Sequence, residues 1–165
     1  MPFDYFRRLS RRQQQIYLES DGITSIPLPD PLALRPAVDA IETGLQRDDR
    51  EAVERAANQL SAALMQLLAV DPVQVEILAV RPRSATSELH GLYTREDDGQ
   101  ALIRVWMRTA RHRRVVAFRT FLRTLVHEFC HHLDYVFLLL GDSLHTEGFF
   151  KRESSLVHQL APRPR

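Results

Sequence analysis

Two histidines and one glutamate stand at a spacing that lets them act on the same metal ion. In the segment His127-Glu128-Phe129-Cys130-His131, the two histidines are four residues apart. Positions four apart on an α-helix differ by only about 40° around its axis, so both imidazoles can reach one ion. Glu128 points about 100° away from His127, which suits a general base better than a third ligand. The H-E-x-x-H spacing therefore predicts a zinc site whose water is activated for hydrolysis.

The residues on either side of this segment predict a helix with one apolar and one polar face. Between positions 114 and 139, apolar residues recur at steps of three and four. The opposite face holds the two histidines and Glu128 together with Thr120 and Thr124. In a helix this apolar, the polar side chains need partners, because an unsatisfied buried polar group costs about 1 to 3 kcal/mol. A metal ion bound by both imidazoles would satisfy them together.

A third ligand must come from outside this helix, because catalytic zinc usually has three protein ligands and a water. We expect His145 in this role, since Gly141 ends the helix and lets the chain turn back over the metal face. Glu147 and Glu153 are the alternative third ligands. Both lie in the first turns of a helix expected over 146–160, and either can supply a carboxylate.

Other polar residues are candidates for supporting roles around the ion. Asp134 lies within about 20° of the direction of His127 on the helix. It is expected either to accept the second N–H of a zinc ligand or to stand as a solvated charge. The group that stabilises the oxyanion of the reaction is expected among Tyr93, Tyr135 and His158, which the sequence does not rank.

The remaining histidines and the cysteine of this region receive structural interpretations. His132 points toward the apolar flank of the helix and is expected at its packing boundary. His90 and His112 have no partner at ligand spacing, so we expect them at the surface. Cys130 lies on a different side of the helix from His131, which favours a small buried hydrophobe.

The metal-binding helix must be positioned by the rest of the chain. Apolar spacing predicts helices over 4–20, 35–46 and 49–69, so the N-terminal portion, 1–70, is expected to be helical throughout. The portion over 73–160 is expected to hold a sheet and the metal-site helices. We predict that the two portions form a single domain.

Alternating apolar residues predict the strands of the sheet. They run over 73–79, 89–93 and 101–107, and an Asp98-Gly99 pair supplies a hairpin turn between the last two. The predicted fold class is α+β: a small mixed sheet, the metal helix beneath it, and a final helix that closes the site.

Composition excludes several classes of protein. A chain of 165 residues, 44% hydrophobic and 26% charged, fits one folded domain. Its single cysteine excludes an internal disulfide and a cysteine-rich zinc site. The longest apolar run, over 136–140, is far shorter than the roughly 20 residues that span a bilayer. Residues 1–12 lack an export signal, so we expect a cytoplasmic protein with no membrane partner.

Positive charge is concentrated near the metal helix, although the net charge of the chain is only +1. Seven arginines and no acidic residue lie from Arg104 to Arg123. Such a run is compatible with nucleic-acid binding or with acidic substrates, but a solvated basic face is the favoured interpretation. The expected partner is a protein or peptide substrate. No feature of the sequence predicts an oligomeric state.

Four motif positions and one aromatic residue resemble the zincin-type metallopeptidases, and among these the SprT-like and related small families. The matching residues are His127, Glu128, His131, and His145 followed by Phe149, within a region over about 102–153. This resemblance implies a zinc-dependent peptidase in which Glu128 takes a proton from water and delivers it to the leaving amine. It also implies that the strand over 101–107 lies along the cleft and pairs with an extended substrate.

A second resemblance leads to a different third ligand. The segment Arg152-Glu153-Ser154-Ser155-Leu156 is similar to peptidases that cleave phage repressors, and this similarity would make Glu153 the ligand. Two other functions are also compatible with the sequence. One is a regulatory or toxin-like module with a structural zinc site, and the other is an arginine-rich protein associated with nucleic acid.

Overall fold

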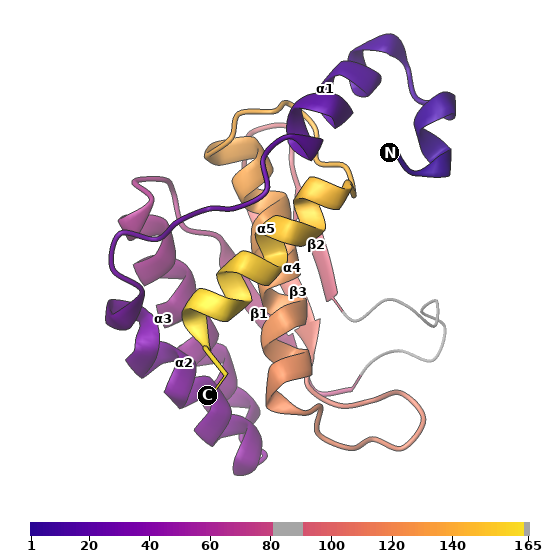
Figure 1. The fold of residues 1–165 in the computed structure, drawn as a ribbon. Coiled ribbons are helices and arrows are strands. Elements are labelled where there is room, and N and C mark those ends of the chain that lie inside the picture. Colours follow the sequence, from indigo (N-terminus) through magenta and orange to yellow (C-terminus); the bar gives the residue numbers. More distant parts are fainter. Residues whose placement is uncertain (81–90, 164–165) are drawn as a thin grey trace.

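A three-stranded sheet lies behind two crossing helices (Figure 1). The computed structural model describes residues 1–80 and 91–163. Strands β1 (Gln74–Leu78), β2 (Gly91–Arg95) and β3 (Ala101–Trp106) have the spatial order β1-β3-β2. β3 is parallel to β1 and antiparallel to β2. The small mixed sheet predicted from the sequence is thus confirmed, and β3 is its central strand.

The outer edge of β1 is covered by side chains of helix α3, which spans Arg50–Leu67. The amide of Asn58 donates to the carbonyl of Val75 at 2.8 Å and accepts from its N–H at 2.9 Å. The carboxylate of Glu54 accepts from the N–H of Ile77 at 2.8 Å. These bonds satisfy the backbone groups that an edge strand otherwise leaves open. β2 is the other edge strand, and among the described strands none pairs with its outer edge.

Two antiparallel helices form the N-terminal part of the core. Helix α2 spans Arg35–Gln46, as predicted, and packs against α3. Asp49 begins α3 as its N-cap, because its side chain accepts a hydrogen bond from the N–H of Ala52. Asp48, with a φ of 54°, makes the tight turn between the two helices.

The first region predicted as one helix is divided. A 3₁₀ turn over Asp4–Arg8 precedes helix α1, which spans Arg11–Asp21. Ser10 caps α1: its side chain accepts from the N–H of Gln13, whose own side chain bonds back to the backbone of Ser10. The predicted single helix over 4–20 is wrong at this point because the capping box starts a new helix that apolar spacing alone does not reveal.

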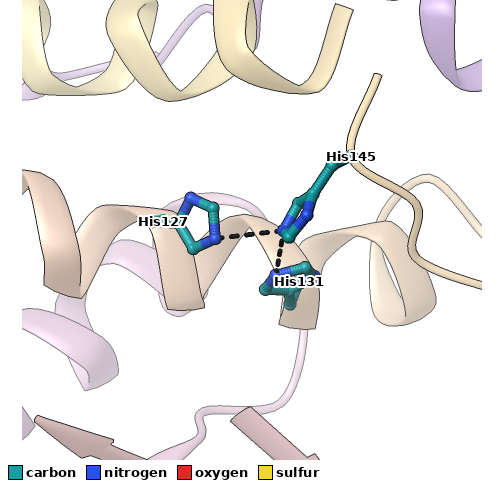
Figure 2. Close-up of side chains that lie close together, drawn as sticks. All are labelled: His127, His131 and His145. Carbon is teal, nitrogen blue, oxygen red and sulfur yellow. Dashed lines mark hydrogen bonds between the residues drawn. The ribbon is translucent and has the colours of Figure 1, made fainter. Parts of the chain in front are cut away.

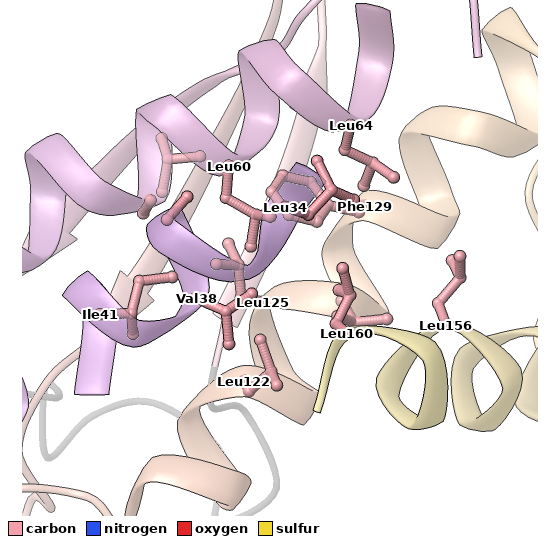
Figure 3. Close-up of a cluster of buried hydrophobic side chains, with 14 of the residues drawn as sticks. Leu34, Val38, Ile41, Leu60, Leu64, Leu122, Leu125, Phe129, Leu156 and Leu160 are labelled. Atoms are coloured by element: carbon pink, nitrogen blue, oxygen red, sulfur yellow. The ribbon is translucent and has the colours of Figure 1, made fainter. Parts of the chain in front are cut away.

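Helices α4 (Phe118–Val136) and α5 (Glu147–Leu160) form the other part of the molecule. α4 packs against the sheet on one side and against α5 on the other. Buried side chains from α2, α3, α4 and α5 meet in one core (Figure 3). The labelled members of this core are Leu34, Val38, Ile41, Leu60, Leu64, Leu122, Leu125, Phe129, Leu156 and Leu160.

The predicted α+β class is confirmed, with helices and a small mixed sheet sharing one core. Within the described ranges, none of the helices has both the length and the apolar character needed to cross a bilayer.

Candidate metal centre

Three imidazole rings converge beside α4. The Nε2 atom of His145 lies 3.2 Å from Nε2 of His127 and 3.1 Å from Nε2 of His131 (Figure 2). One ring nitrogen from each histidine lies within 4.8 Å of the other two. Two nitrogens bound about 2.0 to 2.1 Å from a tetrahedral ion stand about 3.3 Å apart, close to the spacing seen here. The three histidines are therefore close enough to bind one metal ion.

The second nitrogen of His127 is held by a carboxylate. Its Nδ1 atom lies 2.6 Å from Oε1 of Glu153. The other oxygen of that carboxylate accepts from Nη1 of Arg123 at 2.9 Å. A carboxylate that is paired with an arginine can only accept, so Nδ1 of His127 carries the proton. Nε2 of His127 then presents a lone pair to the other two rings.

His131 is oriented by a chain of hydrogen bonds that begins at a buried ion pair. Asp134 and Arg152, both fully buried, pair at 3.1 Å. Burial raises the pKa of Asp134 to about 6, and Arg152 opposes this rise, so the carboxylate is ionised at neutral pH. Ser143 Oγ donates to Asp134 at 2.7 Å and therefore accepts from Nδ1 of His131, also 2.7 Å away. Nε2 of His131 also presents a lone pair.

Protons alone do not satisfy the three converging nitrogens. Nε2 of His145 carries at most one proton, while Nε2 of His127 and Nε2 of His131 each face it with a lone pair. One of those lone pairs is left without a donor among the described side chains. A divalent cation accepts all three lone pairs at once, and imidazole nitrogen is a common ligand of zinc. The donor set therefore fits a metal ion.

Glu128 lies beside this centre in a tightly restricted space. Its side chain is 5% exposed, and burial raises the pKa of its carboxyl to about 7, while His127 lowers it and Glu153 raises it further. Gly91 of β2 faces it. A Cβ atom at Gly91 would lie 3.2 Å from Oε1 of Glu128 and 3.1 Å from Cγ2 of Thr124. A glycine at this position therefore lets strand β2 approach helix α4 closely.

A cavity of about 1050 Å³ runs along the polar face of α4. The five residues that the sequence places on that face, Thr120, Thr124, His127, Glu128 and His131, all line it. β2 contributes to its lining, and so do α5, Ser143 and His145. Among the candidates for oxyanion stabilisation, Tyr93 and Tyr135 line the cavity, whereas His158 is exposed and does not.

The strand at the cleft is β2, whereas the sequence predicts that the strand over 101–107, which is β3, pairs with substrate. β3, over Ala101–Trp106, hydrogen-bonds to β1 and β2 on its two edges, so it has no free edge to offer. β2 is the strand that lines the cavity, through Gly91, Leu92 and Tyr93. The prediction failed because sequence alternation identifies strands but not their order in the sheet.

The third histidine is carried by a segment that the N-terminus holds in place. We call residues 137–146 the ligand loop. The hydroxyl of Tyr5 donates to the carbonyl of His145. Gln13 donates to Asp142 at 3.3 Å, and Ser20 bonds to Thr146 at 3.1 Å between hydroxyls.

A close approach of backbone follows directly after the ligand loop. A Cβ atom at Gly148 would lie only 2.5 Å from the carbonyl oxygen of Ser20, and the N–H of Gly148 donates to Asp21 at 3.0 Å. Only glycine fits so close to the end of α1. The start of α5 is thereby fixed against α1.

The alternative ligands lie outside the cluster of three histidines. Glu153 contacts Nδ1 of His127 on the side away from the other rings, and Glu147 is exposed and pairs with Lys151 at 3.1 Å. Ser143 was not expected at the site, because its distance from His131 in the sequence matches no ligand or helix spacing. The pairing of Glu153 with His127 joins two helices, so no local pattern indicates it.

The other residues interpreted from the sequence take structural places. Cys130 is buried, and His112 is exposed, as predicted. His132 is 3% exposed and bonds through its two nitrogens to Tyr93 and to the carbonyl of Asp71. Leu89 and His90, at the start of the strand predicted over 89–93, lie outside the described residues.

The arginine run from Arg104 to Arg123 is divided between different surfaces. Arg104 pairs with Glu76 at 3.4 Å, and Arg108 pairs with Asp48. Of the seven arginines, only Arg119 and Arg123 line the cavity. The run therefore does not act as one continuous basic face.

Comparisons with models of protein families, with curated proteins and with the solved structures found no match to this chain.

Proposed function

We propose that this chain is a zinc-dependent metallopeptidase of the zincin type, with His127, His131 and His145 as the ligands and Glu128 as the general base. One observation carries the proposal: three imidazole Nε2 atoms converge at hydrogen-bonding distance with too few protons to satisfy them. The buried carboxyl of Glu128 lies next to them in the same cavity.

The number of ligands favours a catalytic over a structural ion. Structural zinc sites are almost always closed by four protein ligands, whereas catalytic sites use three and keep one position open. In the part of the chain that is described, the group able to hold a metal contains three residues, all histidines. The open position would face the cavity that Glu128 also lines.

The proposed reaction assigns each residue a separate task. A bound zinc ion would supply a Lewis acid that polarises the scissile carbonyl and lowers the pKa of water to about 7. Glu128 would take the proton of the attacking water and return it to the leaving amine. Glu153 and Ser143 would keep the rings of His127 and His131 in their binding tautomers.

The cleft suits an extended polypeptide. β2 lines it with an outer edge that no described strand covers, so its N–H and C=O groups are available for a substrate strand. Pairing through the backbone positions a peptide without requiring a particular sequence. The scissile bond would then lie between β2 and the three histidines.

The decisive test uses Glu128→Gln, which keeps the shape of the side chain but removes the base. We expect zinc bound at one equivalent per chain in both proteins, measured by elemental analysis, and peptide hydrolysis reduced by about 10² to 10⁴-fold in the variant. Equal hydrolysis by both proteins would overturn the assignment of Glu128.

The same pair of proteins separates the alternatives. If the wild-type protein holds zinc but hydrolyses no peptide of a mixed library, a module with a structural zinc site becomes the better interpretation. If it binds DNA in a salt-dependent manner that survives His127→Ala, the protein associated with nucleic acid is favoured.

A further inference from the structure

The cavity has chemically different ends. Arg119, Arg123 and Arg163 line it on the side of the N-terminal half of α4, and we call these three residues the arginine end. Arg119 precedes His127 by eight residues, which corresponds to about 12 Å along the helix. Tyr93 and Tyr135 line the opposite side, beyond the histidines.

The arginine end carries positive charge that the protein does not neutralise. Arg123 pairs with Glu153. Arg119 donates to the carbonyl of Ala161 at 3.1 Å, which leaves its charge uncompensated. Among the described residues, no carboxylate oxygen lies within 4.0 Å of the guanidinium of Arg119 or of Arg163.

The acidic groups of the cavity lie elsewhere. Its lining contains two carboxylates, those of Glu128 and Glu153, and both stand beside the histidines. A divalent ion at the three histidines would offset them, so the arginine end would stay positive in the metal-bound protein. A negatively charged ligand is favoured in such a concave site, because low-dielectric walls concentrate the electric field of the arginines.

We infer that the preferred substrates are acidic peptides, with an Asp or Glu side chain bound at the arginine end. This inference rests on the proposed peptidase function. An extended chain advances about 3.3 Å per residue, so the acidic residue would lie roughly two to four residues from the scissile bond. Arg163 and Arg119 would donate to its carboxylate, and a guanidinium matches that group with two parallel bonds.

A peptide explains this arrangement better than a nucleic acid does. Arg104 and Arg108 are paired with Glu76 and Asp48, so these two arginines do not extend the positive surface of the arginine end as phosphate tracking requires. The edge of β2 that no described strand covers would offer backbone groups to a peptide.

The experiment compares zinc-loaded wild type with Arg163→Gln, Arg163→Lys and Arg111→Gln. Arg163 is exposed and lies outside the metal centre, so its variants leave the ligands intact; Arg111 is exposed and does not line the cavity. Substrates are paired peptides that differ only by Glu or Gln at each position up to four residues from a cleaved bond. The readouts are kcat/KM, zinc content, and binding of the same peptides to Glu128→Gln protein.

We expect the Glu peptide to be preferred at one or two positions on one side of the scissile bond. Each ion pair should contribute roughly a two- to fivefold preference that weakens as salt is added. Arg163→Gln should reduce the preference most, Arg163→Lys should retain part of it because the charge remains without the two parallel bonds, and Arg111→Gln should retain it, with zinc content equal in all four proteins.

The outcomes separate the two proposals. Cleavage with equal kcat/KM for Glu and Gln peptides at every position would overturn the acidic preference and leave the peptidase function intact. Absence of zinc-dependent cleavage of any peptide would overturn the peptidase function and the inference that rests on it. Stronger competition by an oligonucleotide than by the acidic peptide would also overturn the inference, in favour of a nucleic-acid ligand.

Discussion

Glu153 accepts a hydrogen bond from Nδ1 of His127 at 2.6 Å, so a residue that the sequence offers as an alternative ligand instead orients a candidate ligand. A carboxylate behind an imidazole fixes the tautomer and the direction of the ring, and it raises the basicity of the nitrogen that faces the ion.

Glu153→Gln should weaken zinc binding without abolishing it. The amide is a poorer acceptor for the N–H of His127, and loss of such an outer partner typically costs about 10- to 100-fold in metal affinity. Competition with a chromogenic chelator measures the change. Glu147→Gln is the control, because Glu147 is exposed and pairs with Lys151. A loss of binding as large as that of His127→Ala would instead identify Glu153 as a ligand.

His145→Ala should remove the third ligand and leave two histidines on one helix. A full set of zinc ligands contributes about 10 to 16 kcal/mol in zinc-finger peptides, so loss of one ligand should lower affinity by roughly three orders of magnitude. His112→Ala, at an exposed position, should bind zinc as the wild type does. Unchanged stoichiometry and affinity in His145→Ala would contradict the assignment.

Asp134→Ala should destabilise the fold as well as the site. It removes one partner of a fully buried ion pair and leaves Arg152 charged without compensation. The expected loss in free energy of unfolding is about 3 to 5 kcal/mol, measured by urea denaturation of the metal-free protein. Asp39→Ala removes an exposed partner of Arg35 and should change stability by less than about 1 kcal/mol. Similar losses of stability in both variants would show that the buried ion pair contributes no more to stability than the exposed one.

Tyr5→Phe should weaken zinc binding, although Tyr5 is 140 positions away from His145 in the sequence. Its hydroxyl holds the backbone of His145, and loss of one hydrogen bond costs about 0.5 to 1.5 kcal/mol, which corresponds to a two- to tenfold change in affinity. Isothermal titration with zinc measures the effect, and circular dichroism should show unchanged helix content. Wild-type affinity in this variant would mean that the ligand loop keeps its position without the N-terminus.

Local periodicity predicts the part of the site that lies on one element. Thr120, Thr124 and Glu128 line the cavity with the two histidines of α4, because a helix fixes which residues share a face. The sequence places the end of the helix at Gly141, but α4 ends earlier, at Val136. Positive φ angles at Leu139 (53°) and Gly141 (83°) mark the turn that precedes His145.

Contacts between distant segments are what the sequence leaves undetermined. Ser143 reaches His131 only because the ligand loop folds back, and Tyr5 reaches His145 across 140 positions of the chain. Asn58 of α3 likewise covers the edge of β1 from a distant part of the chain. No period of two or 3.6 residues encodes such pairings.

The joining of α1 to the start of α5 also sets when the centre can form during synthesis. Residues Ser20 and Asp21 leave the ribosome early, yet their partners Thr146, Gly148 and Arg152 emerge more than a hundred residues later. A nascent chain that stops short of α5 has neither Glu153 behind His127 nor Arg152 beneath Asp134. Translation of the last helix is thus the step that completes the candidate metal centre, and unfinished chains lack it.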